Sequence, residues 1–402
     1  MVLRCVKLKL TEWVLLTVIG ILSPMLAGAD TEQSIRWHGF LSQGLIATDD
    51  NNFLGDSESI SSELTEVGIG ASWNATSRIH FSAQALYLKA GDSAPDGVEL
   101  DFGLVDINLI NDATHGLGVR AGRLKNPYGF YNETRDVMAT RASILLPESI
   151  YPDTLREIYH SSDSIGLHGY KEIGSTLFQF DVISGKPLIG DDTLDDMALF
   201  APGTQSKNNE LWVGRLMAEY DGGRLRGGIS RVNLTGDLKP GPVNPLFPLF
   251  DGELELDMTL FSLEYNQLRW QLTAEYQIFD ARIKDYYLPG FSSENTGESW
   301  YLQARYEFMS RWYLLARYDV YYGNKDDKDG KDRVASGNPP SYAAFAKDTT
   351  FSLRYELNEH WVLSTELHHV SGIGWLRSQD NADYANLEKN WNMLLFQVGY
   401  HF

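Results

Sequence analysis

The stretch that decides the fold is Trp270-Gln271-Leu272-Thr273-Ala274-Glu275-Tyr276-Gln277-Ile278, in which every second side chain is apolar. The side chains between them are polar or charged. Successive side chains on a β-strand point to opposite faces, so this stretch predicts a strand with one apolar and one polar face. A tilted strand of about ten residues is also long enough to cross the hydrocarbon core of a bilayer.

The same alternation recurs along the chain, most clearly at 299–308, 312–322, 348–357 and 391–402. Counted from end to end, it predicts sixteen strands. They span residues 35–47, 63–75, 78–89, 98–110, 116–123, 164–170, 176–183, 209–220, 224–234, 254–265, 269–279, 299–308, 312–322, 348–357, 361–371 and 391–402. A closed barrel of this size is expected to enclose a water-filled lumen rather than a packed core.

The connections between the predicted strands alternate between short turns, such as 221–223, and long loops, such as 235–253 and 280–298. A soluble β-sandwich has no reason to keep this alternation, whereas membrane barrels have short periplasmic turns and long external loops. Aromatic side chains beside the short turns share the apolar face, as in the girdle of such a barrel. They are Trp73, Tyr220, Tyr265, Trp270, Phe308, Trp312 and Trp361. We therefore predict an all-β, sixteen-stranded antiparallel transmembrane β-barrel in the bacterial outer membrane.

The first residues of the chain predict a signal peptide. Basic residues precede an apolar run at 13–22, which is too short to span a membrane comfortably, and residues 27–29 (Ala-Gly-Ala) form a cleavage site. We expect residues 1–29 to be removed and residues 30–402 to form one barrel domain. An uncleaved anchor helix is the alternative.

Composition excludes several other classes of protein. The formal net charge of -20 argues against nucleic acid as a partner. The chain has one cysteine, Cys5, which leaves no disulfide framework and no cysteine-based metal site. The nine histidines are scattered, and no spacing marks a nucleophile and its base, so we expect neither an enzyme nor a bound cofactor or metal.

Two segments carry a resemblance to a known family. The chain ends in Phe396-Gln397-Val398-Gly399-Tyr400-His401-Phe402, which resembles the assembly signal of Gram-negative porins, a terminal Phe after alternating apolar residues. Gly122-Arg123-Leu124-Lys125-Asn126-Pro127-Tyr128-Gly129 resembles the Gly-x-x-Lys-x-Pro-x-Gly stretch of the phosphate-selective porins O and P. The resemblance implies a trimeric diffusion pore, often anion-preferring, with its third external loop inserted in the barrel. The chain departs from that family in lacking a dense ladder of lysines and arginines.

The connection 126–163 is the longest, and a long segment without strand character usually serves a function. Lodged inside the barrel it would narrow the pore; the alternative is an external flap. Charge near a constriction sets the selectivity of a pore, so we take charged residues of this loop and of the lumen-facing wall as candidates. The candidate pore-lining and constriction residues are Arg120, Lys125, Arg135, Arg141, Glu148, Asp153, Arg156, Arg215, Arg317 and Glu366.

The sequence thus favours a passive diffusion channel for small polar or anionic solutes, phosphate-like anions among them. An outer-membrane receptor or adhesin barrel without channel function is the alternative. Expected partners are the solutes, outer-membrane lipid and lipopolysaccharide, and two further copies of the chain. Small outward side chains such as Ala83 and Ala85, together with the outward Gln43, place the predicted trimer contact on the first five strands.

Overall fold

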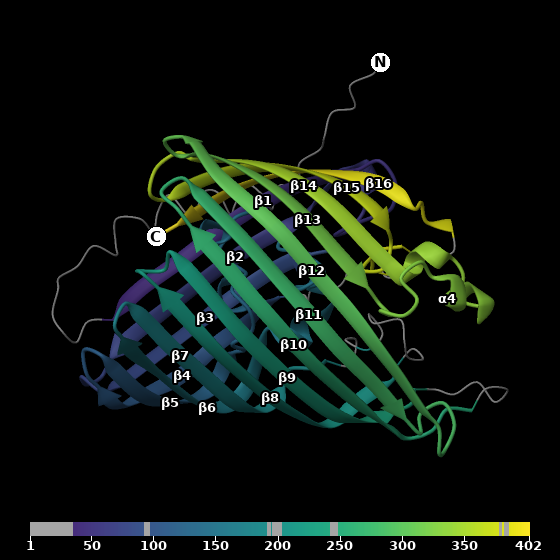
Figure 1. The fold of residues 1–402 in the computed structure, drawn as a ribbon, viewed down its shortest axis with the longest axis horizontal. Coiled ribbons are helices and arrows are strands. Elements are labelled where there is room, and N and C mark those ends of the chain that lie inside the picture. Colours follow the sequence, from purple (N-terminus) through teal and green to yellow (C-terminus); the bar gives the residue numbers. More distant parts are fainter. Residues whose placement is uncertain are drawn as a thin grey trace.

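The computed structural model describes residues 35–91, 97–190, 194, 203–241, 248–377, 380–381 and 386–402. Its sixteen strands are all antiparallel and form a closed barrel, in which each strand pairs with its neighbours in the sequence and β1 pairs with β16 (Figure 1). In this part of the chain no helix is long and apolar enough to cross a membrane. The predicted signal peptide lies outside the described residues.

The strands confirm the predicted number and order. They are β1 (Arg36–Thr48), β2 (Ser61–Asn74), β3 (Ile79–Ala90), β4 (Val98–Asn111), β5 (His115–Lys125), β6 (Ser161–Ile173), β7 (Thr176–Pro187), β8 (Gln205–Tyr220), β9 (Leu225–Lys239), β10 (Gly252–Asn266), β11 (Trp270–Lys284), β12 (Ser292–Met309), β13 (Trp312–Tyr322), β14 (Phe345–Glu356), β15 (Trp361–Gly372) and β16 (Asn390–His401). Two short helices lie in the connections. The helix α2 (Arg156–Tyr159) lies between β5 and β6, and α4 (Lys331–Ala335) lies between β13 and β14.

The apolar face of the alternation points outward. Leu302, Phe351 and Leu367 are each exposed by 57–58% on the outside of the barrel. Near the turns, Trp270 stacks on Tyr306 and Trp312 on Tyr355, with ring centroids 4.2 and 4.3 Å apart. Cross-strand aromatic pairs stabilise the strand register, and amphipathic rings suit a membrane–water boundary. The barrel therefore presents an apolar belt to lipid.

The alternation reverses toward the loop ends of β9 to β12. On β10 the outward side chains change from apolar at Phe261 to polar at Thr259 and Asp257, while the inward ones change from Ser262 to the fully buried Leu260. A strand that leaves the bilayer faces water on its outside, so the polar face turns outward. The predicted loops 235–253 and 280–298 are therefore longer than the observed ones. In the structure β9 runs to Lys239, β11 runs to Lys284, and β12 begins at Ser292.

Buried apolar side chains pack the segment between β5 and β6 against the wall in the half of the barrel nearer the long loops. They form two clusters. The first joins the segment between β5 and β6 to β7–β12 and includes Tyr128, Ile150, Tyr151, Ile158, Leu211, Leu234, Leu256 and Leu260. The second joins it to β1–β3 and β14–β16 and includes Phe53, Leu64, Ile144, Leu145, Ile373, Trp375 and Trp391. The inserted segment lies between these two clusters.

Candidate pore constriction

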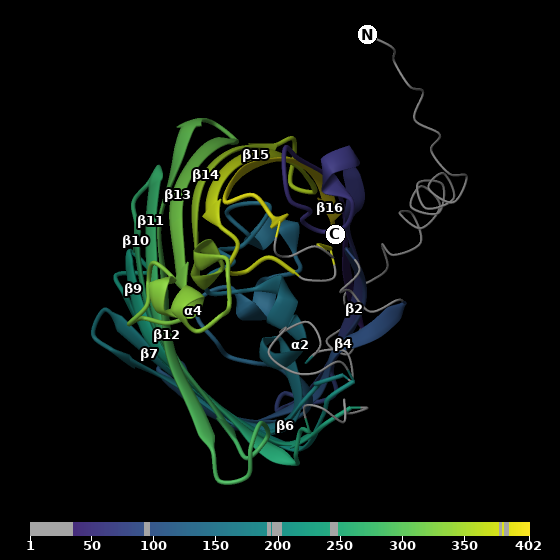
Figure 2. The ribbon, with the colours of Figure 1, turned by 90° about the vertical axis from the view of Figure 1, so that its right-hand side faces the viewer.

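The segment 126–160, between β5 and β6, lies inside the barrel, and Figure 2 shows its helix α2 within the ring of strands. We call it the lumen loop. Its two ends are held together because the Asn126 amide donates to the His160 carbonyl at 2.9 Å, and the Asn132 side chain donates to the carbonyls of Asn126 and Tyr159. The predicted boundary at 163 lies three residues too far, since β6 begins at Ser161.

One side of the lumen loop is fastened to β11 and β12 through a single buried carboxylate. Glu275 accepts hydrogen bonds from the hydroxyl groups of Tyr151 and Tyr301 at 2.6 and 2.9 Å, and from the Phe130 amide at 3.2 Å. The Tyr128 hydroxyl donates to Gln277 at 2.7 Å. Two of these donors, Tyr151 and Phe130, belong to the lumen loop, so the carboxylate holds that backbone against the wall.

The opposite side of the lumen loop is fastened to β13 and β15. Arg317 donates to the Ser143 hydroxyl at 2.9 Å and to the Leu145 carbonyl at 3.0 Å. Glu366 accepts from the backbone amides of Ile144 and Leu145. Arg317 and Glu366, two of the predicted wall residues, thus hold the lumen loop in place.

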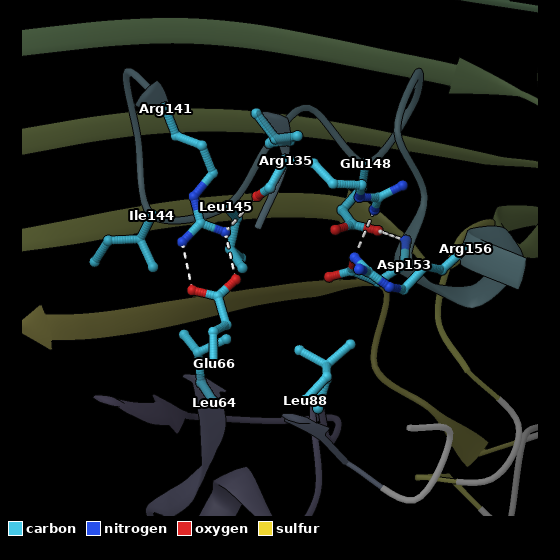
Figure 3. A pocket seen from close by; sticks show the side chains of 12 residues that line it. Leu64, Glu66, Leu88, Arg135, Arg141, Ile144, Leu145, Glu148, Asp153 and Arg156 are labelled. Carbon is cyan, nitrogen blue, oxygen red and sulfur yellow. Dashed lines mark hydrogen bonds and ion pairs between the residues drawn. The ribbon is translucent and has the colours of Figure 1, made fainter. Parts of the chain in front are cut away.

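A third attachment joins the lumen loop to β2. Arg141 and Glu66 form a bidentate ion pair with both N–O distances at 2.7 Å (Figure 3). Beside the pair, a cavity of about 20 Å³ lies between the lumen loop and the wall. It is lined by Leu64, Glu66, Leu88, Ala90, Arg135, Arg141, Ile144, Leu145, Leu146, Glu148, Asp153 and Arg156. This volume holds about one water molecule.

The charges around this small cavity consist of three arginines and three carboxylates. Arg135 donates to Asp153 at 2.7 Å, and Glu148 accepts from the Asp153 amide at 3.1 Å. Burial raises the pKa of Glu148 to about 8, and the charge of Asp153 adds to this effect. Burial alone would raise the pKa of Asp153, but the charges of Arg135, Arg377 and Arg156 lower it. Each of the three arginines has a carboxylate partner, because Arg135 pairs with Asp153, Arg141 with Glu66 and Arg156 with Asp136.

A second buried cluster lies at the base of the lumen loop. Lys125 lies 2.9 Å from Asp101 and 3.2 Å from Asp136, and Arg156 lies 2.5 Å from Asp136. The His160 Nε2 atom is 2.6 Å from Asp101. Three of these groups, Asp101, Asp136 and His160, lie close enough to share a metal ion, but Lys125 and Arg156 already neutralise the two carboxylates. Burial and the charge of Arg156 lower the pKa of His160 to about 4, which keeps the imidazole neutral.

The remaining predicted residues lie on the wall below the lumen loop. Arg215 bridges Glu133 of the loop at 2.6 Å and Asp181 of β7 at 2.9 Å. Arg120 bonds to Asp106 at 2.8 Å, and 35% of its side chain stays exposed to the lumen. Of the predicted arginines and lysine, Arg120 has the most exposed charge. Its outward neighbour Arg123 pairs instead with Asp163 on the outside of the barrel.

Several buried charged or titratable residues that contact or belong to the lumen loop were not among the predicted candidates, namely Glu66, Asp101, Asp136, His160 and Glu275. Glu66 and Glu275 lie on the lumen-facing side of the alternation, so the pattern contained a signal for them. Asp101 points inward because β4 has an extra residue at this position, where the register with β3 shifts between Gln84 and Ala85. A bulge of this kind leaves no mark in a period-two pattern.

No protein-family model matches the chain, and no curated protein sequence matches it. Among solved structures, the chain is similar to the outer-membrane expressed OmpT of Vibrio cholerae, with a TM-score of 0.57 at 13% identity over 93% of this chain and 99% of that one. The anion-selective porin from Comamonas acidovorans gives 0.56 at 12% identity over 92% and 100%. The outer membrane channel DcaP of Acinetobacter baumannii gives 0.58 at 11% identity over 94% and 100%. The chain thus has the fold of outer-membrane porins, and with its apolar belt this fold places it in the bacterial outer membrane.

Proposed function

We propose that the chain is an outer-membrane diffusion channel for small polar or anionic solutes, and that the lumen loop forms its constriction. The observation that carries the proposal is that charged side chains of the lumen loop and of the β2–β3 wall lie beside the small gap between them (Figure 3). An apolar plug would seal the gap, whereas fixed charges and hydrogen-bond donors stabilise water and polar solutes there.

Arginines around this gap support an anion preference. Arg135, Arg141 and Arg156 line it, each paired with a carboxylate, and burial raises the pKa of the nearby Glu148 to about 8. Below the gap, Arg120 adds a charge that is still exposed to the lumen. Fixed guanidinium groups in a narrow site raise the local concentration of anions. The resemblance of residues 122–129 to the phosphate-selective porins supports phosphate-like anions as one class of solute.

A receptor or adhesin barrel without channel function is the second candidate, and one observation favours it. The two apolar clusters pack the lumen loop against the wall, and the cavity beside the Arg141–Glu66 pair has only about 20 Å³. A barrel that only presents its external loops works with a closed lumen, and it has no use for a gap lined by charges.

Conductance in planar bilayers tests the proposal. The purified barrel should give stable single-channel steps, and a potassium chloride gradient should give a reversal potential on the anion-selective side at low salt. A barrel that inserts, as shown by protease protection, but never conducts would establish the second candidate. A conducting barrel that prefers cations would refute the anion preference. It would mean that the acidic loops set the electrostatic field that selects the ions.

The proposal includes a trimer joined through β1 to β5. Outward side chains on these strands are small at Ala83, Ala85 and Ala121. On β1 the outward Gln43 accepts a hydrogen bond from Thr65 at 2.8 Å, an arrangement that suits a protein contact better than lipid. Crosslinking in membranes should capture three copies, and capture of monomers alone would reject the trimer. We also propose that the chain is cleaved after residue 29 and that the external rim of the barrel contacts lipopolysaccharide.

A further inference from the structure

The barrel wall has a break between β4 and β5 near their loop ends. The hydrogen-bonded ladder of these strands ends at the pair Gly103–Arg123, although β4 continues to Val98 and β5 to Lys125. Beyond this pair, toward the loop ends of the strands, hydrogen bonds from side chains replace the backbone hydrogen bonds. Arg123 donates to the Leu100 carbonyl at 3.2 Å, and the Ser161 hydroxyl donates to the Asp101 carbonyl at 3.0 Å.

A cavity of about 440 Å³ lies at this break, within the size range of small-molecule sites. Its lining includes side chains from both faces of the sheet. Leu86 and Leu88 point into the lumen, as does Glu66, the cross-strand partner of Leu88, whereas Leu100 and Arg123 point outward. The cavity therefore touches both faces of the sheet at the loop end of β4.

The surroundings of the cavity are those of an amphiphile site. Part of its lining is apolar, formed by Leu86, Leu88, Leu100, Leu188 and Ile189, and the other part is polar, formed by Glu99, Asp101, Arg123, Arg156, His160 and Ser161. Its outer mouth opens beside side chains that face lipid, with Val98 exposed by 71%, Leu100 by 47% and Ile165 by 65%. An acyl chain would bury its surface against the leucines and Ile189, and a polar head group would lie beside the charged part of the lining.

Arg123 supplies a polar anchor at the mouth. Its guanidinium has five N–H donors, and the bonds to Asp163 and to the Leu100 carbonyl use three of them. Arg156 also lines the cavity, farther inside the barrel. Guanidinium groups at one end of an apolar cavity suit a carboxylate at the end of a chain.

We infer that this break is a lateral entrance through which a single-chain amphiphile with an anionic head group, such as a fatty acid, binds from the outer leaflet. Its acyl chain lies against Leu86 and Leu88, and its head group lies at Arg123. This site is distinct from the gap between the lumen loop and β2, although Leu88 and Arg156 line both cavities.

Photolabelling with palmitate that carries a diazirine on its chain tests the inference in vesicles that contain the barrel. We expect adducts on the lumen-facing Leu86 and Leu88, and none above background on Ser82, which faces the lumen on the same strand nearer the turn. Adducts confined to the outward Ala85 and Tyr87 would overturn the inference, because they require only lipid outside an intact wall.

Two variants give matched controls. Leu100→Trp fills the mouth and should reduce labelling of Leu86 and Leu88 by about fivefold or more, because an indole adds a large apolar body there. Leu167→Trp, at an outward position of β6, should leave the labelling unchanged. Arg123→Ala should weaken labelling by the palmitate probe but not by the corresponding uncharged alcohol. Equal labelling of all variants would refute the site, whatever the conductance of the same preparations shows.

Discussion

Arg141 of the lumen loop and Glu66 of β2 form a bidentate ion pair in which both side chains are more than nine-tenths buried. The two residues are 75 positions apart in the sequence. Glu66 also accepts hydrogen bonds from Ser42 at 2.5 Å and from Gln397 at 3.3 Å. The pair therefore joins the tip of the lumen loop to the seam where the first and last strands close the barrel.

Breaking this pair should loosen the lumen loop. Glu66→Ala leaves the Arg141 guanidinium buried without its partner, which costs ~3–5 kcal/mol. We expect noisier single-channel currents and a lower unfolding midpoint in heat-modifiability gels. The double variant Glu66→Leu with Arg141→Met removes both charges and should regain most of the lost stability. If the single variant unfolds like the native barrel, the pair does not hold the loop.

Charge at Arg120 should set part of the ion preference. Arg120→Glu replaces an exposed lumen cation by an anion, so the ratio of chloride to potassium permeability should fall. The effect should shrink at high salt, where the Debye length is short. Adding Lys125→Glu should lower the ratio less than the first change does, because Lys125 is nearly buried against Asp101 and Asp136.

Arg123→Glu is the matched control for Arg120→Glu. It lies three residues along the same strand but points outward, where it pairs with Asp163. Reversal potentials should therefore stay close to those of the native barrel. An equal shift in both variants would mean that the field arises at the external surface and not in the lumen.

Glu148 should make the stability of the barrel depend on pH. Its pKa is about 8 in the folded protein against an ordinary value of 4.5, because burial and Asp153 disfavour the charged form. The folded state therefore holds this proton more tightly than the unfolded state does. Its contribution to stability is complete below about pH 4.5 and is lost as the pH rises through about 8.

The Glu148→Gln variant checks this dependence. Its unfolding midpoint should match that of the native barrel near pH 5 and exceed it near pH 9, because glutamine has no proton to lose. The depressed pKa of Asp153 acts with the opposite sign and only in more acidic solution, so it does not mask the effect. A midpoint difference that is the same at both pH values would contradict the raised pKa of Glu148.

The reversal of the alternation predicts where β12 leaves the membrane. Leu302 and Thr296 point outward on the same strand, six residues apart. Leu302→Arg places a charge in the apolar belt and should destabilise the folded barrel by ~2–4 kcal/mol. Thr296→Arg should change its stability little, because that position already faces water. Unfolding in urea from lipid vesicles measures both, and equal losses would show that the belt reaches Thr296.

The period-two alternation determined the number of strands, their order, and the outward face of the belt, because side-chain alternation is a local property of a strand. Trp270 to Ile278 shows this pattern without any knowledge of its neighbours. Glu219 and Arg226 form an ion pair of 3.0 Å across the hairpin of β8 and β9, on either side of the short turn at 221–223. The sequence likewise placed charged residues such as Arg317 and Glu366 on the lumen face.

Only the tertiary structure decided what those charges do. Ile144 meets Glu366 across 222 positions, and Tyr128 meets Gln277 across 149. Such contacts depend on the path of the lumen loop through the barrel, and that path is set by packing between two apolar clusters rather than by any local pattern. The local sequence also predicts neither the bulge at Asp101 nor the reversal on β10. The reversal arises because the same alternation faces lipid at one height of the barrel and water at another.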